Sequence, residues 1–140
     1  MDSVIKALVY VGRLQQALRD LNDKLGQTGL PTTLWFDIIP SESGVLVQGF
    51  LDVELPNGNA LSHDLDFVAI GSKCCVSTSQ IRITPEGSDI LKSTGEMECT
   101  TIQELGSAMS ACERFIQEIS ISDIRGESCG SDSVAKLTLT

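Results

Sequence analysis

The chain has 140 residues and a mass of 15.0 kDa, which is the length of a single domain with its own core. A hydrophobic fraction of 41%, a charged fraction of 21% and a mean hydropathy of +0.10 exclude global disorder, and no apolar run reaches the roughly 18 residues of a membrane span. Ten Lys and Arg against 19 Asp and Glu give a net charge of −9. This charge disfavours direct binding to nucleic acid or to an anionic membrane, because both need a cationic surface.

The N-terminal residues 1–6 lack the basic region and the long apolar run of a secretory signal, so we expect a cytoplasmic protein. The five cysteines are odd in number and form no C-x-x-C motif, which fits neither a disulfide framework nor a zinc site. We therefore expect reduced thiols. Cys112 is expected in the core, and Cys129 is expected to be the most exposed thiol.

A long amphipathic helix is predicted over residues 2–26, because apolar residues recur there at alternating spacings of three and four. Gly26 and Pro31 end it, since glycine favours a helix stop and proline cannot continue a helix. Five segments rich in β-branched and aromatic residues follow, separated by turns that contain Pro or Gly, and they predict an antiparallel meander. These segments are Thr33–Ile39, Val45–Leu55, Leu61–Ile70, Val76–Thr84 and Ile90–Glu98.

A second helix is predicted to begin at Thr100 or Thr101, where Thr101 and Glu104 fit a capping box, and to end near Ile119. The fold class is therefore α+β, an antiparallel β-meander of about five strands flanked by a long N-terminal helix and a C-terminal helix. Residues 1–121 form a single domain, and residues 122–140 form a flexible tail in which 134–139 could be a terminal strand.

The negative charge is concentrated on the early strands, because residues 31–72 carry six acids and no base. In the second and third predicted strands the odd positions are apolar and predict the core face, while acids occupy even positions. A two-residue turn at Asn57-Gly58 would mix these faces. A three-residue loop over residues 57–59 keeps them consistent, pairs Pro56 with Ala60 and sets Asp52 opposite Asp64.

Five even-numbered residues are the candidate partner-binding residues on the outward face: Phe50, Asp52, Glu54, Asp64 and Asp66. Like charges opposed across strands cost up to about 1 kcal/mol each, so such a cluster is either solvated or retained because something cationic docks on it. Three explanations stay open: a solvated acidic face, a basic protein partner, or a divalent cation. An exposed aromatic among the acids favours protein recognition over metal binding.

The usual marks of enzyme chemistry are missing from the sequence. His63 is the only histidine, and Ser62-His63-Asp64 matches a catalytic triad in letters only, because neighbours on a strand point to opposite faces. No phosphate-binding glycine motif and no G-x-S-x-G elbow is present. We therefore predict no catalytic residue, no metal and no cofactor. Trp35 is expected in the core of the first strand, although only one of Trp35 and Phe36 can face inward.

The order of a long helix, an antiparallel sheet and an apolar-striped helix resembles the class I type III secretion chaperones. The local similarities lie in the segment 25–31 followed by Leu34 and Phe36, and in the hairpin 81–87 that leads into 102–119. The resemblance implies a homodimer that binds an extended client segment along exposed sheet and helix surface. The chain departs from that family because residues 71–80 are too short to supply the helix that interrupts its sheet.

Together these features predict a non-enzymatic acidic protein-binding module, a chaperone, adaptor or regulator of a partner with a basic surface, that forms a homodimer and binds neither nucleic acid nor membrane. One alternative is an acidic inhibitor or immunity-type protein that masks the basic surface of a nucleic-acid-handling enzyme. Another is a small-molecule binder or an enzyme that uses Cys75 or Cys99.

Overall fold

The computed structural model describes residues 2–127 and confirms the α+β class. A long helix is followed by six strands and a second helix, and residues 121–127 form a further short helix. The elements are α1 (Asp2–Gly26), β1 (Thr32–Ser41), β2 (Gly44–Glu54), β3 (Ala60–Ile70), β4 (Lys73–Thr84), β5 (Gly87–Ser93), β6 (Met97–Cys99) and α2 (Ile102–Gln117).

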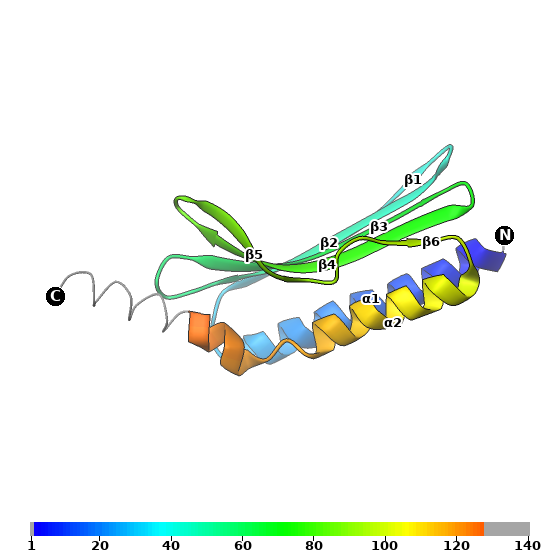
Figure 1. Cartoon of the computed structure of the whole chain (residues 1–140). Helices are drawn as coiled ribbons and strands as arrows, with labels where there is room; N and C mark the ends of the chain where they lie inside the picture. The colour runs from blue at the N-terminus through cyan, green and yellow to red at the C-terminus, as the bar shows by residue number, and fades with distance from the viewer. Residues whose placement is uncertain (1, 128–140) are drawn as a thin grey trace.

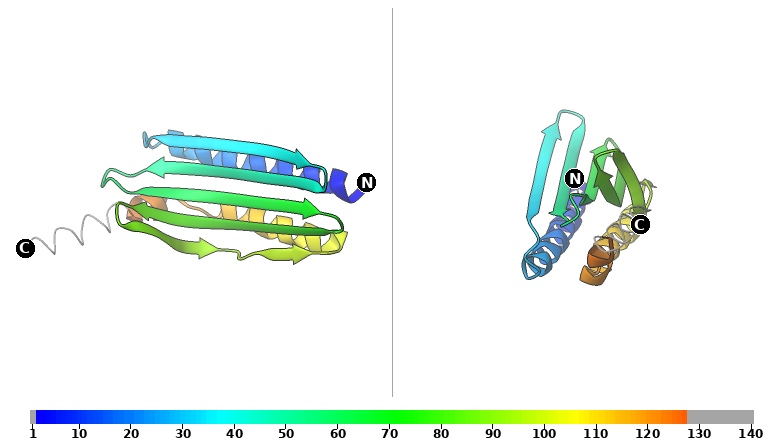
Figure 2. Two further views of the ribbon diagram at one scale, coloured as in Figure 1. Left: turned by 90° about the horizontal axis from the view of Figure 1, so that it is seen from above. Right: turned by 90° about the vertical axis from the view of Figure 1, so that its left-hand side faces the viewer.

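The strands form one antiparallel sheet in the order β1-β2-β3-β4-β5, and β6 pairs with the other half of β4 (Figure 2). The fifth expected strand, 90–98, is thus two separate strands. At the break, the Thr94 hydroxyl accepts from the Thr78 backbone N–H over 3.1 Å, and the Thr94 N–H donates to the Thr78 carbonyl over 3.0 Å. These two bonds replace the regular ladder where β5 gives way to β6.

Both long helices lie side by side on the same face of the sheet (Figures 1 and 2). The odd positions of β2 and β3 point toward them and are buried, as the alternation of the sequence predicts. An ion pair of 2.6 Å between Arg13 and Glu113 joins the helices outside this core. The largest fully buried side chains include Leu14, Leu18, Leu25, Leu51, Leu61, Leu65, Phe67 and Met109.

The start of α2 confirms the predicted capping box. The Glu104 backbone N–H donates to the Thr101 hydroxyl over 3.1 Å, and the Glu104 carboxylate accepts from the Thr101 N–H over 3.1 Å. Thr101 takes an extended backbone conformation, as an N-cap residue does. The helix ends at Gln117, two residues before the expected end near Ile119.

The predicted register between β2 and β3 is wrong by two residues. Phe50, and not Asp52, lies opposite Asp64, and Asp52 lies opposite Ser62. The three-residue loop is Pro56-Asn57-Gly58 rather than 57–59. Pro56 has no N–H to give to the ladder, so it occupies the turn, and the Leu55 N–H donates to the Asn59 carbonyl over 2.9 Å.

Gly58 closes this turn with a φ of 87°, the left-handed conformation that follows a tight turn in three-residue hairpin loops. A shift by two residues leaves each side chain on its predicted face, because strand faces alternate with period two. The face assignment is therefore correct, while the cross-strand neighbours are different. Gly49, for example, pairs with Leu65, whereas the predicted register would place it opposite Phe67.

The packed part of the chain extends beyond residue 121, where the sequence analysis ended the domain. Ile124 in the short helix 121–127 is fully buried, and Glu127 forms an ion pair of 3.2 Å with Arg82 on β4. The possible terminal strand at 134–139 lies outside the described residues. Within residues 2–127 no helix is long and apolar enough to cross a membrane.

We predict that Ile124→Ala lowers the free energy of unfolding by about 2–4 kcal/mol, because it leaves a cavity at a fully buried position. Chemical denaturation measures this loss. Ile102→Ala is the matched control, because Ile102 also lies on a helix but its exposed fraction is 41%. This variant should lower the free energy of unfolding much less. Equal losses for the two variants would contradict the assignment of Ile124 to the core.

Candidate functional site

The face of the sheet that points away from α1 and α2 is not covered by any described element (Figure 1). We call it the outer face. It is formed by the odd positions of β1 and β4 and the even positions of β2 and β3, as the register requires. Eight residues line a shallow depression in its middle: Trp35, Gln48, Gly49, Phe50, Asp52, Ser62, Asp64 and Asp66.

Four of the five predicted binding residues meet in this depression, namely Phe50, Asp52, Asp64 and Asp66. The fifth, Glu54, lies exposed at the end of β2, opposite Ala60, and does not line it. Pairing of even with even positions is the reason that the four come together. Glu54 therefore lies apart from the other four candidate residues.

The three carboxylates of the depression differ in their surroundings. Asp64 is half-buried and accepts a short hydrogen bond from the Ser62 hydroxyl. Asp66 is exposed and accepts from the Gln48 amide over 3.5 Å. Burial raises the pKa of Asp64; the Ser62 hydrogen bond opposes this effect, and the neighbouring carboxylates of Asp52 and Asp66 add to it. The pocket therefore holds negative charge at a cost.

Asp52 has a buried carboxylate oxygen, Oδ1, with no hydrogen-bond partner in the structure. A buried polar atom without a partner costs about 1–3 kcal/mol and more when it is charged. Among residues 2–127 the ion pairs lie elsewhere, and none of them involves Asp52, Asp64 or Asp66. These three acids therefore have no cationic partner within the described part of the chain.

An aromatic pair adjoins the acids. The rings of Trp35 and Phe50 are stacked with centroids 5.5 Å apart at an interplanar angle of 26°. Trp35 is 41% exposed on the outer face, so its predicted place in the core is wrong. Phe36 takes the inward position instead, over Gly49, where a Cβ would lie only 2.7 Å from the Phe36 ring.

Four members of the depression were not identified from the sequence: Trp35, Gln48, Gly49 and Ser62. Strand parity places Trp35 and Phe36 on opposite faces of β1, but it does not say which of them faces outward. Gln48 and Ser62 lie at even positions of β2 and β3 and carry no distinctive pattern. Within the described residues no cluster of three or more His, Cys, Asp or Glu is arranged to hold a metal ion.

The side chain of His63 lies on the opposite face of the sheet from those of Ser62 and Asp64, which lie on the outer face. It is buried on the side of the helices, where its Nδ1 donates to the Leu51 carbonyl over 2.9 Å and its Nε2 accepts from the Gln80 amide over 3.1 Å. Both ring nitrogens are thus occupied in the neutral form. This arrangement serves packing and is not a catalytic triad.

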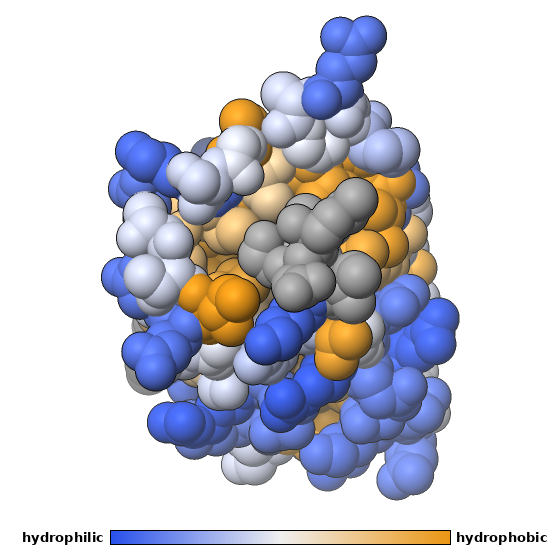
Figure 3. Space-filling model, turned by 90° about the vertical axis from the view of Figure 1, so that its right-hand side faces the viewer, coloured by the Kyte–Doolittle hydropathy of each residue, from blue (hydrophilic) through white to orange (hydrophobic). Residues whose placement is uncertain are grey.

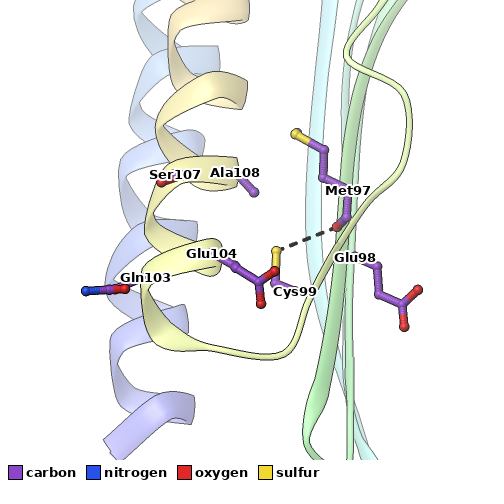
Figure 4. A pocket seen from close by; sticks show the side chains of 7 residues that line it. All are labelled: Met97, Glu98, Cys99, Gln103, Glu104, Ser107 and Ala108. Carbon is purple, nitrogen blue, oxygen red and sulfur yellow. Dashed lines mark hydrogen bonds between the residues drawn. The ribbon is translucent and has the colours of Figure 1, made fainter.

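The two cysteines of the small-molecule alternative lie in different places. Cys75 is on the outer side of β4, and Cys99 is buried between β6 and α2, where its thiol donates to the Met97 carbonyl over 3.7 Å (Figure 4). Burial raises the pKa of both thiols, with Glu96 and Glu98 adding to the shift at Cys75. A raised pKa is the opposite of what an activated nucleophile needs. Cys112 is fully buried, as predicted.

Comparison of the chain with family models, curated proteins and solved structures finds no significant match. The resemblance to the class I type III secretion chaperones therefore stays an expectation. The helix that interrupts the sheet of that family has no counterpart here, because β3 passes through a tight turn directly into β4.

We predict that burial of His63 makes the protein less stable as the pH falls below neutral. Burial lowers the pKa of His63 in the folded chain below its ordinary value of 6.5, so the unfolded chain takes up a proton first. Stability is therefore lost from about pH 6.5 down to the folded pKa, with a slope of at most about 1.4 kcal/mol per pH unit. Urea denaturation between pH 8 and pH 5 measures this slope.

The control is His63→Gln, which removes the titrating group and should flatten the slope, whatever its own stability at pH 8. Asp64→Asn separates the contribution of the outer face. Because its folded pKa is raised, Asp64 gains a stabilising proton as the pH falls, which is the opposite sign. Equal slopes for wild type and His63→Gln would contradict the prediction.

Proposed function

We propose that this chain is a non-enzymatic protein-binding module whose outer face captures a basic segment of another protein. One observation supports the proposal above all others. A stacked aromatic pair, Trp35 and Phe50, adjoins three carboxylates without ion-pair partners on a sheet face that no described element covers. A stretch of 42 residues without a base, 31–72, carries most of this face.

The physical basis is charge complementarity around an apolar anchor. A guanidinium group of the partner would donate to the carboxylates of Asp52 and Asp64, neither of which has an ion-pair partner within residues 2–127. The same cation would relieve the repulsion among Asp52, Asp64 and Asp66. Arginine suits this site better than lysine, because its planar fork binds carboxylates in two places and stacks on aromatic rings.

Isoleucines on the outer face extend the apolar surface beyond the aromatic pair. Ile39 and Ile70 lie toward one end of the sheet and Ile83 and Ile90 toward the other, with exposed fractions from 39% to 68%. An extended segment with alternating basic and apolar side chains fits such a surface. Apolar contact would provide most of the affinity, and the acids would provide orientation and association rate.

We predict that Asp52→Asn with Asp64→Asn weakens binding of an arginine-containing probe peptide at least tenfold and flattens its salt dependence, while the fold is unchanged or slightly more stable. Trp35 is the only tryptophan of the chain and lies in the depression, so its fluorescence reports binding directly. The probe is a peptide of alternating Arg and Ile, titrated from 50 mM to 500 mM NaCl. A peptide with Gln in place of Arg is the ligand control.

The matched protein control is Asp23→Asn with Glu118→Gln. It removes the same two charges from exposed positions on the helical side of the molecule. It should leave affinity and salt dependence close to wild type. Superimposable binding curves for the two double variants would show that net charge alone acts, and that the outer face is only a solvated acidic surface.

The alternative of an inhibitor that masks a basic enzyme surface uses the same acids, but it makes the aromatic pair dispensable. Trp35→Phe keeps an aromatic ring beside Phe50, and Phe50→Ala removes the stacking partner while it leaves Trp35 as the reporter. Under our proposal Phe50→Ala weakens the Arg-Ile peptide about as much as the loss of the two carboxylates. An unchanged affinity of Phe50→Ala, together with a steep salt dependence, would favour the inhibitor.

A homodimer remains a prediction for this chain. The edge of β1 has no neighbouring strand, and apolar side chains of the outer face are exposed, so a second copy could cover both. We expect light scattering at micromolar concentration to give a particle of twice the 15.0 kDa chain mass. A particle of 15.0 kDa would contradict the dimer but not the binding face.

A further inference from the structure

Cys74 and Cys99 lie directly opposite each other on the antiparallel strands β4 and β6. Opposed residues of such a ladder have Cα atoms about 4.5–5.5 Å apart, and disulfides need about 4.4–6.8 Å. Opposed residues also place their side chains on the same face of the sheet. The backbone thus already holds this pair at a spacing that a disulfide can bridge.

The two side chains also meet in one cavity. Cys74 and Cys99 both line an apolar cavity between the sheet and the N-terminal ends of α1 and α2, together with Ala7 and Leu105. Figure 3 looks onto this end of the molecule, where apolar surface lies between more polar borders. Cys74 is partly exposed and Cys99 is buried, and both thiols are free. A small oxidant can therefore reach Cys74 first.

Neighbouring cysteines are less well placed to react with Cys99. Cys75 pairs with Glu98 on the ladder and projects from the opposite face of β4. Cys112 lies on α2, fully buried, and its thiol is engaged with the Thr78 and Thr94 side chains. Among the described residues, the ladder gives only Cys74 a directly opposed position.

We propose that Cys74 and Cys99 form a reversible cross-strand disulfide when the protein meets a low-molecular-weight disulfide such as glutathione disulfide. The proposal does not depend on the binding face. The site assigned is the pair of sulfur atoms in the cavity below β4 and β6, and the reaction is thiol–disulfide exchange.

The exchange has two balanced steps. The Cys74 thiolate attacks one sulfur of glutathione disulfide, breaks its S–S bond and releases one glutathione thiolate. The Cys99 thiolate then attacks Sγ of the mixed disulfide on Cys74 and releases the second glutathione. The protein loses two electrons and two protons, and the two glutathione thiolates take up the protons. Burial raises the pKa of both thiols, so the exchange should be slow near pH 7 and faster at pH 8.5.

The disulfide would link the short strand β6, which leads into α2, covalently to β4. β6 has only three residues, and Cys99 is followed at once by Thr100 and the N-cap residue Thr101. The disulfide closes a loop that contains the 24 residues 75–98. Closing such a loop restricts the unfolded chain, so the oxidised protein should melt about 5–10 °C higher than the reduced one.

The test is peptide mapping of the full chain after incubation with excess glutathione disulfide at pH 8.5, with free thiols blocked before digestion. Trypsin cleaves after Lys73, Arg82, Lys92 and Arg114, so the expected product joins peptides 74–82 and 93–114. Each of these peptides holds two cysteines. Cys75→Ser and Cys112→Ser therefore assign the bond, and both variants should keep it.

The decisive variant is Cys99→Ser, which should retain glutathione on Cys74 because no resolving thiol is left; Cys99→Ala is the second variant if the serine protein does not fold. A melting temperature that rises on oxidation in wild type, but not in Cys99→Ser, supports the same bond. A link from Cys74 to Cys75 or Cys129, or stable glutathione on Cys74 of the wild type, would overturn the proposal. No reaction of Cys74 at pH 8.5 would overturn it as well.

Discussion

Contact between one face of the sheet and the two helices is the interaction on which the rest of this structure depends. Leu51, Leu65 and Phe67 provide the sheet side of that contact and Leu14 and Met109 the helix side, all essentially inaccessible to water. Each large side chain buried in this way contributes roughly 1.5–3 kcal/mol. Both long helices pack against this one face of the sheet, so no described element covers the opposite face.

The polar groups on the two faces of the sheet have different surroundings. On the inner face His63 finds partners for both ring nitrogens, and Gln80 supplies one of them. On the outer face Asp52 has an unpartnered oxygen, and Asp64 is surrounded by other carboxylates. His63 is therefore satisfied within the chain. The three carboxylates of the depression, in contrast, have no ion-pair partner within residues 2–127.

Period-two alternation made the faces of β2 and β3 predictable from sequence, and the 3.6-residue periodicity did the same for both helices. The hairpin register was not predictable from face consistency alone, since shifts by two residues satisfy it equally. The decision lay with Pro56, whose missing N–H places it in the turn. The short helix 121–127 was missed because only two of its residues, Ile121 and Ile124, pack against the core, and two positions are too few to make a periodic pattern.

The stacking of Trp35 on Phe50 escaped prediction for a related reason. The sequence pattern says that Trp35 and Phe36 face opposite ways, but it does not say which one faces inward. The choice depends on Gly49 across the strand, which has no side chain and so leaves room for the Phe36 ring. Long-range fit of this kind is information that no local pattern carries, and it decided the composition of the candidate site.

The broken strand pair β5 and β6 gives the two edges of the sheet different properties. On that side the ladder is interrupted between Ser93 and Met97, carries a bulge at Gln80 and Ile81, and presents the charged Asp89 and Lys92. These are devices by which proteins block pairing with further strands. On the other side β1 is ten residues long and continuous. Only the β1 edge of this sheet is open to pairing with a strand of a second copy. Once two copies pair through their β1 edges, no open edge is left, so edge pairing stops at two molecules and does not lead to a fibre.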